Sequence, residues 1–357
     1  MNVLSRKTRS RPQLRRWEVG GEFHWCEWPP GPRVPWPKPG AWYALGRHAV
    51  AALLRMKQRR LWIPDYFCHD VVEHWRSSCS LAMYRDDPRW PEPDWRSLRP
   101  RAGDWVLAMN YFGARQQDPW RLWKERENVL LLEDHSHDPV SRWALSSDAD
   151  YAFASLRKTL PVPDGALLWS PRGHKLPAPP GQESLSVAAG LKLSAMLLKS
   201  EYLTGRAPAR AKAHYRRAQE LGEVLMPGGA EAISHISLDL LRRGLPQAWR
   251  TRRRVNAKEL SRSIQGWSHG KPVDTRWPEG AAPLALVLCL DSQESRDKCR
   301  EYLENNDIYC PIHWPMPQFV GAEARTLSAQ LLSIPIDQRY DKADMETVSK
   351  KLKSFRP

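Results

Sequence analysis

The chain has 357 residues, 41% of them hydrophobic, and a formal net charge of +15 at neutral pH. This length allows a large hydrophobic core and about two domains, so a folded protein is expected. The longest apolar stretches, such as residues 282–290, are too short to cross a bilayer, and no apolar segment follows the N-terminal charges. We therefore expect neither a membrane span nor a secretion signal.

Much of the positive charge lies in local runs. Residues 1–16 contain six Arg and Lys residues and no acidic residue, and further basic runs occupy 206–217 and 242–254. Such runs can contact nucleic acid, phosphate or an acidic membrane surface, but they are more often solvated helix faces. A nucleic-acid partner is therefore not expected.

The six cysteines include no CxxC pair and no closely spaced metal-binding pattern. The sequence thus indicates neither a disulfide framework nor a zinc site. Reduced thiols in a cytoplasmic protein are the expectation, with no bound metal.

The hydrophobic pattern predicts alternating helices and strands. Helices are expected at 43–58, 65–78 and 118–127, and strands at 60–64, 80–87, 104–113, 128–136, 151–156 and 165–169. This alternation indicates an α/β fold with a mostly parallel sheet covered on both faces. Helical regions at 184–223 and 231–268 follow, and then strands at 282–290 and 331–336 around a helix at 291–306.

These elements predict three parts of the chain. Residues 1–40 form a basic and Trp/Pro-rich segment, whose indoles are expected to pack it on the body in an extended conformation. Residues 41–245 form a large domain, and residues 246–357 form a smaller C-terminal α+β domain.

Lys158 stands in SLRKTLPVPDGALL, between two strand-like runs at 151–156 and 165–169. A charge beside buried strands is costly unless it is paired or used. It could form a structural ion pair with Asp164 or Asp134. It could also be a reactive amine.

Other polar groups favour the second interpretation. Asp134 lies near the carboxyl end of the strand at 128–136 and His137 follows it, where open α/β sheets bind ligands. Gly46 opens a helix whose free N–H groups suit a phosphate. A lysine, a carboxylate and a phosphate cradle are the groups that pyridoxal 5'-phosphate (PLP) requires. An HxH spacing at 135–137 lacks an evident third metal ligand, and an aspartate at a strand end is often only a helix cap.

The order of these segments resembles the DegT/DnrJ/EryC1/StrS family of fold-type-I PLP-dependent aminotransferases. The similar segments are GRHAVAAL, IPDYFCHDVV, NYFG, LLLEDHSHDP, FASLRKTLPVPDGALL, CPIHWP and LLSIPID, which run in this order from about residue 40 to residue 336. The resemblance implies that Lys158 is the Schiff-base lysine and that Asp134 pairs with the pyridine nitrogen. It also implies that His137 lies near the phenolic oxygen of the cofactor.

Further site residues come from the same resemblance. Gly46, Arg47 and His48 correspond to the phosphate turn, and Tyr66 or Phe67 to the aromatic residue that stacks on the ring. His313, in CPIHWP, corresponds to a histidine near the substrate pocket.

The chain also departs from the family pattern. Phe153 replaces the usual serine five residues before the lysine, which leaves Ser155 as the candidate hydroxyl for the phosphate. Arg47 and His48 stand where small hydroxyl residues are common, and a usual Gly-Gly pair is Gly165-Ala166.

The resemblance implies a cytoplasmic homodimer that transfers an amino group from an amino acid such as glutamate to a keto sugar linked to a nucleotide. Two alternatives remain open at this point. One is another PLP-dependent reaction, such as that of a lyase, a dehydratase or a bond-forming enzyme. The other is a basic binding protein without a cofactor.

Overall fold

A central seven-stranded sheet organises the larger body of the molecule. The computed structural model describes residues 16–37, 39–179, 187–226, 231–273 and 277–356. The strands of this sheet lie in the order β3 (Gly40–Tyr43), β9 (Ala166–Trp169), β8 (Tyr151–Ser155), β7 (Leu130–Asp134), β6 (Trp105–Met109), β4 (Leu61–Pro64) and β5 (Leu81–Tyr84). Strand β9 runs antiparallel to both of its neighbours, β3 and β8, and the other strand pairs of this sheet are parallel. The predicted mostly parallel sheet is therefore confirmed.

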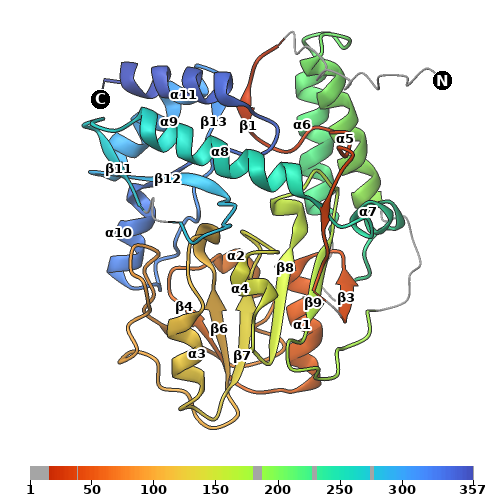
Figure 1. Cartoon of the computed structure of the whole chain (residues 1–357), viewed down its shortest axis with the longest axis vertical. Helices are drawn as coiled ribbons and strands as arrows, with labels where there is room; N and C mark the ends of the chain where they lie inside the picture. Colours follow the sequence, from red (N-terminus) through yellow and green to blue (C-terminus); the bar gives the residue numbers. More distant parts are fainter. Residues whose placement is uncertain (1–15, 38, 180–186, 227–230, 274–276, 357) are drawn as a thin grey trace, which may run out of the picture.

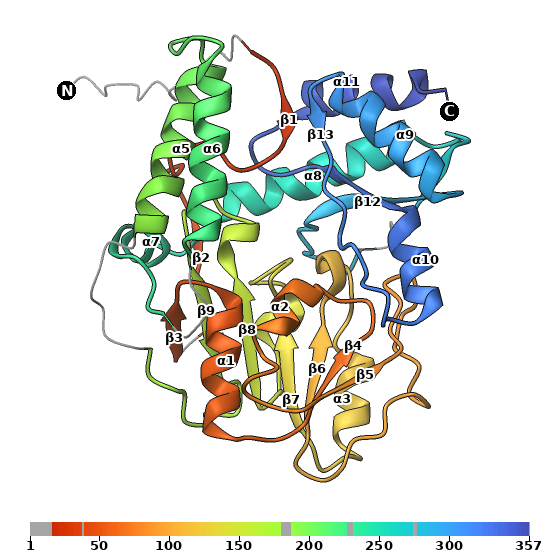
Figure 2. The same cartoon turned by 180° about the vertical axis from the view of Figure 1, so that it is seen from behind.

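The two faces of the sheet are covered by different helices. Helices α1 (Gly46–Met56) and α2 (His69–Glu73) lie on one face, and α3 (Asp118–Lys124) lies on the other (Figures 1 and 2). Leu107 and Met109 pack in the same cluster as the buried side of α1, whereas Val106 and Ala108 pack with Trp120 of α3. This alternation is typical of a strand that is buried on both faces.

The helix predicted at 65–78 is much shorter in the structure, where α2 spans only His69–Glu73. Residues 65–68 are held by tertiary hydrogen bonds instead. The Asp65 carboxylate accepts hydrogen bonds from the N–H groups of Tyr66 and Asp86, and the Tyr66 hydroxyl donates to the carbonyl of His313. These contacts replace the local bonds that a helix would have formed here.

The two long helical regions are each divided by a turn. The first contains α5 (Val187–Leu203) and α6 (Ala211–Val224), and the second contains α7 (His235–Leu241) and α8 (Gln247–Ser263). Gly205 and Gly244 follow α5 and α7 with φ angles of 76°, a left-handed conformation that ends helices. A side chain at Gly244 would also lie 3.0 Å from the carbonyl oxygen of Val34.

A second, smaller sheet lies beyond α8 in sequence. It contains β11 (Gly270–Pro272), β12 (Ala285–Leu290) and β14 (Leu331–Pro335), all antiparallel, with α8, α9 (Gln293–Glu304) and α11 (Lys342–Ser354) packed around it (Figure 1). Helix α10 (Ala322–Gln330) precedes β14. The remaining elements are the strands β10 (Leu245–Pro246) and β13 (Ile308–Tyr309), the short helix α4 (Arg142–Leu145), and the 3-10 turns η1 (Tyr111–Gly113) and η2 (Leu156–Lys158).

The described part of the N-terminal segment is extended, and it packs on both the larger body and the C-terminal part that contains the smaller sheet. Its strand β1 (Val19–Gly20) pairs with β13, and its strand β2 (Arg33–Val34) pairs with β10. The Trp28 and Trp249 rings lie 5.0 Å apart, and Trp36 donates its indole N–H to the carbonyl of Leu241 at 2.5 Å. The expected packing through indoles is confirmed.

Among the helices of the described residues, none combines the length and the apolar character needed to cross a bilayer.

We expect Trp36→Ala to lower the free energy of unfolding by about 3–5 kcal/mol, because it removes a large buried side chain. Trp36 is 7% exposed and Trp90 is 37% exposed. The control Trp90→Ala should therefore change the free energy by no more than about 0.5 kcal/mol. Urea unfolding measures both variants, and equal losses would contradict this role of Trp36.

Candidate active site

Asp134 is the last residue of β7 and faces the loops at the carboxyl end of the sheet. It is 3% exposed, and one carboxylate oxygen accepts the Ser136 N–H at 2.8 Å. Glu133, one residue earlier, instead accepts hydrogen bonds from the Trp143 indole at 2.8 Å and the Ser147 hydroxyl at 2.6 Å. Because side chains alternate along a strand, only Asp134 of these two acids reaches the site.

Lys158 ends the 3-10 turn that directly follows β8, the neighbour of β7. It is half-buried, and its Nζ atom lies 5.8 Å from the centroid of the Trp314 ring. Within the described ranges, Lys158 forms no ion pair with either Asp164 or Asp134. Asp164 accepts hydrogen bonds from Ser234 and Ser237 instead. The alternative of a structural ion pair with these acids is therefore not found.

Lys158 and Asp134 line the same small cavity, of about 50 Å³. Most of its other walls come from the start of α1, the segment before α2 and the end of β8. The lining residues are Leu45, Gly46, Arg47, Phe67, Cys68, Val71, Asp134, Ser136, Phe153, Ser155, Arg157, Lys158 and Trp314. This cavity thus brings together six of the predicted site residues, which are Gly46, Arg47, Phe67, Asp134, Ser155 and Lys158. The seventh, His313, lines the larger cavity next to it.

The N-terminus of α1 opens onto this cavity. Its first turn contains no acidic residue, and no side chain caps it. A side chain at Gly46 would lie 3.2 Å from the Cβ atom of Ser155 and 3.3 Å from the Phe153 ring. The glycine therefore permits the close approach of α1 to the end of β8 that places free N–H groups beside the Ser155 hydroxyl.

Two arginines add positive charge to the same wall. The Nε atoms of Arg47 and Arg157 are buried without a hydrogen-bond partner in the described part of the chain. Arg157 also pairs with Glu223 of α6 at 2.6 Å. Burial opposes ionisation of Glu223, but Arg157 and Lys192 outweigh it and lower the pKa of Glu223 to about 2. Both arginines can therefore meet an anion in the cavity.

His137 lies behind the cavity rather than on its wall. Its ring is fully buried, it stacks on Phe112, and its Nδ1 atom accepts the Phe112 N–H at 2.8 Å. The Nε2 atom has no partner among the described residues. Burial, together with the charge of Lys158, lowers the pKa of His137 well below its usual value. The neutral ring therefore carries its proton on Nε2.

His48 and Tyr66 are also set back from the cavity. His48 is buried within α1, and Tyr66 is fully buried, with its ring 5.8 Å from that of Trp314. Phe67, and not Tyr66, lines the cavity next to Asp134. Tyr66 therefore packs behind the Trp314 wall, and His48 does not line the cavity.

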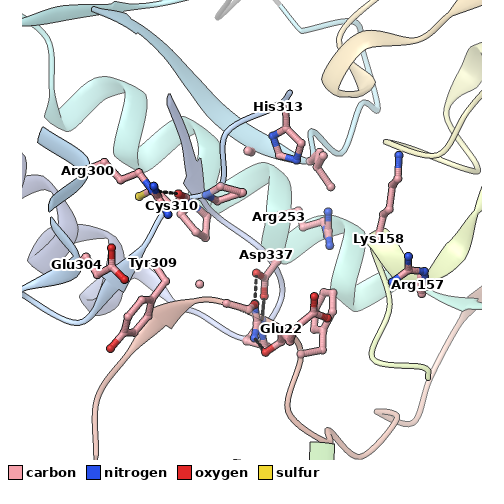
Figure 3. A pocket seen from close by; sticks show the side chains of 18 of the residues that line it. Glu22, Arg157, Lys158, Arg253, Arg300, Glu304, Tyr309, Cys310, His313 and Asp337 are labelled. Atoms are coloured by element: carbon pink, nitrogen blue, oxygen red, sulfur yellow. Dashed lines mark hydrogen bonds and ion pairs between the residues drawn. The ribbon is translucent and has the colours of Figure 1, made fainter. Parts of the chain in front are cut away.

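A larger cavity of about 490 Å³ adjoins the first one, and Arg157, Lys158 and Trp314 line both. Figure 3 shows its polar side chains, which include those of His313, Arg253, Arg300 and Glu304. His313 lies within hydrogen-bond distance of the Ser333 hydroxyl, at 2.8 Å. Lys212, from the basic run at 206–217, does not line this cavity. Its Nζ atom donates to the hydroxyl of Tyr309, a lining residue, at 2.6 Å.

Sequence reasoning missed several of these wall residues, namely Cys68, Arg157, Arg253 and Trp314. Arg157 and Trp314 directly adjoin predicted residues, so their positions in sequence were an available signal. No comparable signal marked Arg253, because its approach depends on the packing of α8. No group of three or more His, Cys, Asp or Glu side chains that could hold a metal occurs among the described residues.

By sequence, the chain matches no family model and no curated protein. Its fold matches solved structures. DesI, solved in the presence of its TDP-sugar product, is 14% identical with a TM-score of 0.58, over 88% of this chain and 79% of that one. Spr1654 from Streptococcus pneumoniae, in its PLP form, is 12% identical with a TM-score of 0.58, over 88% and 86%.

A DegT DnrJ EryC1 StrS aminotransferase from Brucella abortus is 13% identical with a TM-score of 0.55, over 88% of this chain and 85% of that one. These likenesses show that the chain has the fold of these enzymes, that of the fold-type-I transferases. The predicted fold class is confirmed.

We expect His313 to stay neutral down to about pH 4 in the folded protein. Burial and the charge of Lys158 lower the pKa of His313 to about 3. Because the folded pKa lies below that of the unfolded chain, protonation favours unfolding as the pH falls below about 6.5. Histidine NMR with a His313→Asn variant for assignment measures this, and a His313 signal that titrates near pH 6.5 without urea would contradict it.

Proposed function

We propose that the chain is a PLP-dependent aminotransferase. In this proposal it moves an amino group from an amino acid such as glutamate to a keto sugar linked to a nucleotide, or to a related carbonyl compound. The observation that carries the proposal is the placement of Lys158 and Asp134 on one cavity, at the ends of the adjacent strands β7 and β8. The shared fold, and the TDP-sugar and PLP of the similar structures, support the same function.

The residues around the cavity fit the chemistry of PLP. Asp134 has an oxygen left to accept a pyridinium N–H, because the other oxygen holds the Ser136 N–H. The α1 N-terminus, Ser155 and the unpartnered Nε atoms of Arg47 and Arg157 offer donors for a phosphate. The cavity shares Arg157, Lys158 and Trp314 with the larger cavity of about 490 Å³, so the two together offer room for the cofactor and a substrate.

PLP supplies an electron sink for the substrate carbon when it is bound. The chain supplies the remaining groups. Lys158 Nζ would hold the aldehyde carbon and then move a proton at the reacting carbon, and Asp134 would keep the pyridine nitrogen protonated. Phe67 and Trp314, which line the smaller cavity, would exclude water from the cofactor, and the larger cavity would receive the substrate.

The remaining parts of the proposal concern the setting of the enzyme. We place it in the cytoplasm, where its cysteines stay reduced, and we propose a homodimer with a shared active site. The proposed division into a large domain at 41–245 and a small domain at 246–357 would place the larger cavity where the two meet. Lys158 favours amino transfer over the dehydratase alternative, which in the family goes with histidine at this position.

Protein loaded with PLP should show an absorbance band at about 420 nm. We expect Lys158→Ala to abolish this band, because the imine with Nζ can no longer form. Absorbance spectra before and after borohydride measure the imine. The control Lys57→Ala, which changes an exposed lysine, should keep the band. A wild-type protein that takes up no PLP would refute the proposed function.

We expect Asp134→Asn to bind PLP but to lower the rate of amino transfer by about 10²-fold or more, because an amide does not keep the pyridine nitrogen protonated. The asparagine oxygen can still accept the Ser136 N–H, so the loop should keep its structure. Single-turnover absorbance measures the rate. A half-reaction at the wild-type rate would show that Asp134 has another role.

A further inference from the structure

Residues 16–23 form a strap that closes one side of the larger cavity. Residues 20–23 of this strap line the cavity together with Lys158 and His313. None of the strap residues, all of which the structure describes, lines the smaller cavity beside Asp134. The strap therefore belongs to the side of the site that receives the substrate.

The strap is fixed on two sides. Trp17 donates its indole N–H to Asp344 of α11 at 2.8 Å, and β1 pairs with β13. The buried Glu18 carboxylate pairs with Lys199 of α5 at 2.8 Å and with Lys212 of α6 at 3.3 Å. Strand β1 accordingly lies between β13 and the α5–α6 pair in both views (Figures 1 and 2). The strap thus links these two helices to the C-terminal part of the chain.

Two cations hold the backbone of the strap where it lines the cavity. Lys199 donates to the carbonyl of Glu22 at 2.9 Å, and Arg339 donates to the same carbonyl at 3.0 Å. Gly20 has a φ angle of 91°, and a side chain there would clash with the carbonyl oxygen of Tyr309. The position of Glu22 is therefore set by backbone contacts, and its side chain is not needed for them.

The Glu22 carboxylate is a free charge on the wall of the cavity. It is exposed, and it forms no ion pair or side-chain hydrogen bond with the residues that the structure describes. In the view of Figure 3, Glu22 lies between Asp337 and Arg157. Arg157 pairs with Glu223 at 2.6 Å and Arg339 pairs with Asp337 at 2.8 Å, so each of these guanidinium groups has another carboxylate as its partner.

A free carboxylate in this cavity suits an uncharged hydrogen-bond donor. It repels the phosphates of a nucleotide-linked sugar, which the arginines of the cavity can bind instead. A ligand ammonium would meet a surplus of cations, because Lys158 and four arginines line the cavity, against the acidic residues Glu22, Glu304 and Asp337. Hydroxyl groups carry no charge and donate hydrogen bonds, which the two oxygens of a carboxylate accept.

We infer that Glu22 accepts hydrogen bonds from hydroxyl groups of the acceptor and thereby selects a carbohydrate at this site. This inference rests on the proposed amino transfer to a keto sugar. Lys158 and Glu22 line the same cavity of about 490 Å³, so a sugar whose carbonyl faces Lys158 can present ring hydroxyls to Glu22. Glu22 lies outside the segments that resemble the family, which begin at about residue 40.

Calorimetry on full-length protein mixed with PLP tests the inference with two probes of equal charge. TDP-glucose carries hydroxyls and no carbonyl group, so it binds without accepting an amino group. The cyclohexyl ester of TDP has a ring of the same size without hydroxyls. We expect Glu22→Ala to lower the preference for TDP-glucose over the cyclohexyl ester about 10-fold, as for hydrogen bonds to a charged group. Glu22→Gln should keep part of the preference, because its amide oxygen still accepts a hydrogen bond.

The ratio of the two affinities separates hydrogen bonding from a general effect of charge. Loss of the negative charge alone would strengthen the binding of both probes equally and leave the ratio unchanged. The control Glu27→Ala changes an exposed glutamate of the same N-terminal segment and should keep the wild-type ratio. An unchanged ratio in Glu22→Ala, an equal fall in Glu27→Ala, or no binding of either probe would overturn the inference.

A second variant tests the strap without changing Glu22. Gly20→Ala should displace the strap, because of the clash with Tyr309, and should lower the same ratio. The control Gly31→Ala changes a glycine with a φ angle of 110° and open space around it in the described structure, so it should keep the ratio. A wild-type ratio in Gly20→Ala would contradict the role of the strap in placing Glu22.

The outcome for the cofactor is read separately. The strap variants should take up PLP as the wild type does, because no strap residue lines the smaller cavity. Uptake of PLP without the preference for TDP-glucose would leave the proposed amino transfer standing and refute the role of Glu22. The preference without uptake of PLP would refute amino transfer and leave Glu22 as a sugar-binding residue.

Discussion

The pairing of β7 with β8 is the constraint on which the site depends. Asp134 pairs with Phe153 in this parallel register, and both strands end at the same edge of the sheet. Lys158 and Asp134, which are 24 residues apart in sequence, thereby line one cavity. A shift of one residue in β7 would bring Glu133 to this side and move Asp134 to the other, because side chains alternate along a strand.

The second organising feature is an excess of positive charge around Lys158. Arg47, Arg157 and Arg253 each have a donor atom that is buried without a partner in the described structure. Glu223 balances part of this charge on the side of α6. Asp337 and Asp138 act on Arg253 without an ion pair to it among the described residues. The unpartnered donors suit a site for an anionic cofactor and an anionic substrate.

Tertiary contacts replaced several local preferences. Residues 65–68 have a helical pattern in sequence, but the hydrogen bonds of Asp65 with the Asp86 N–H and of Tyr66 with the His313 carbonyl hold them in another conformation beside the cavity. This conformation places Phe67 and Cys68 on the cavity wall. A helix beginning at residue 65 would have given these two side chains other directions. Sequence periodicity could not predict this outcome, because the partners of these bonds lie near residues 86 and 313.

The sequence by itself determined the α/β fold class and the alternation of strands and helices, and it predicted Lys158, Asp134, Gly46 and Arg47, which line one cavity in the structure. These follow from local hydrophobic periodicity and from the ordered segments that resemble a known family. Only the tertiary structure decided that His48, Tyr66 and His137 lie behind the wall and that Arg157 and Arg253 lie on it. The physical reason is that wall positions depend on how distant elements pack, and the packing of α8 against the turn after β8 leaves no periodic signal in the sequence.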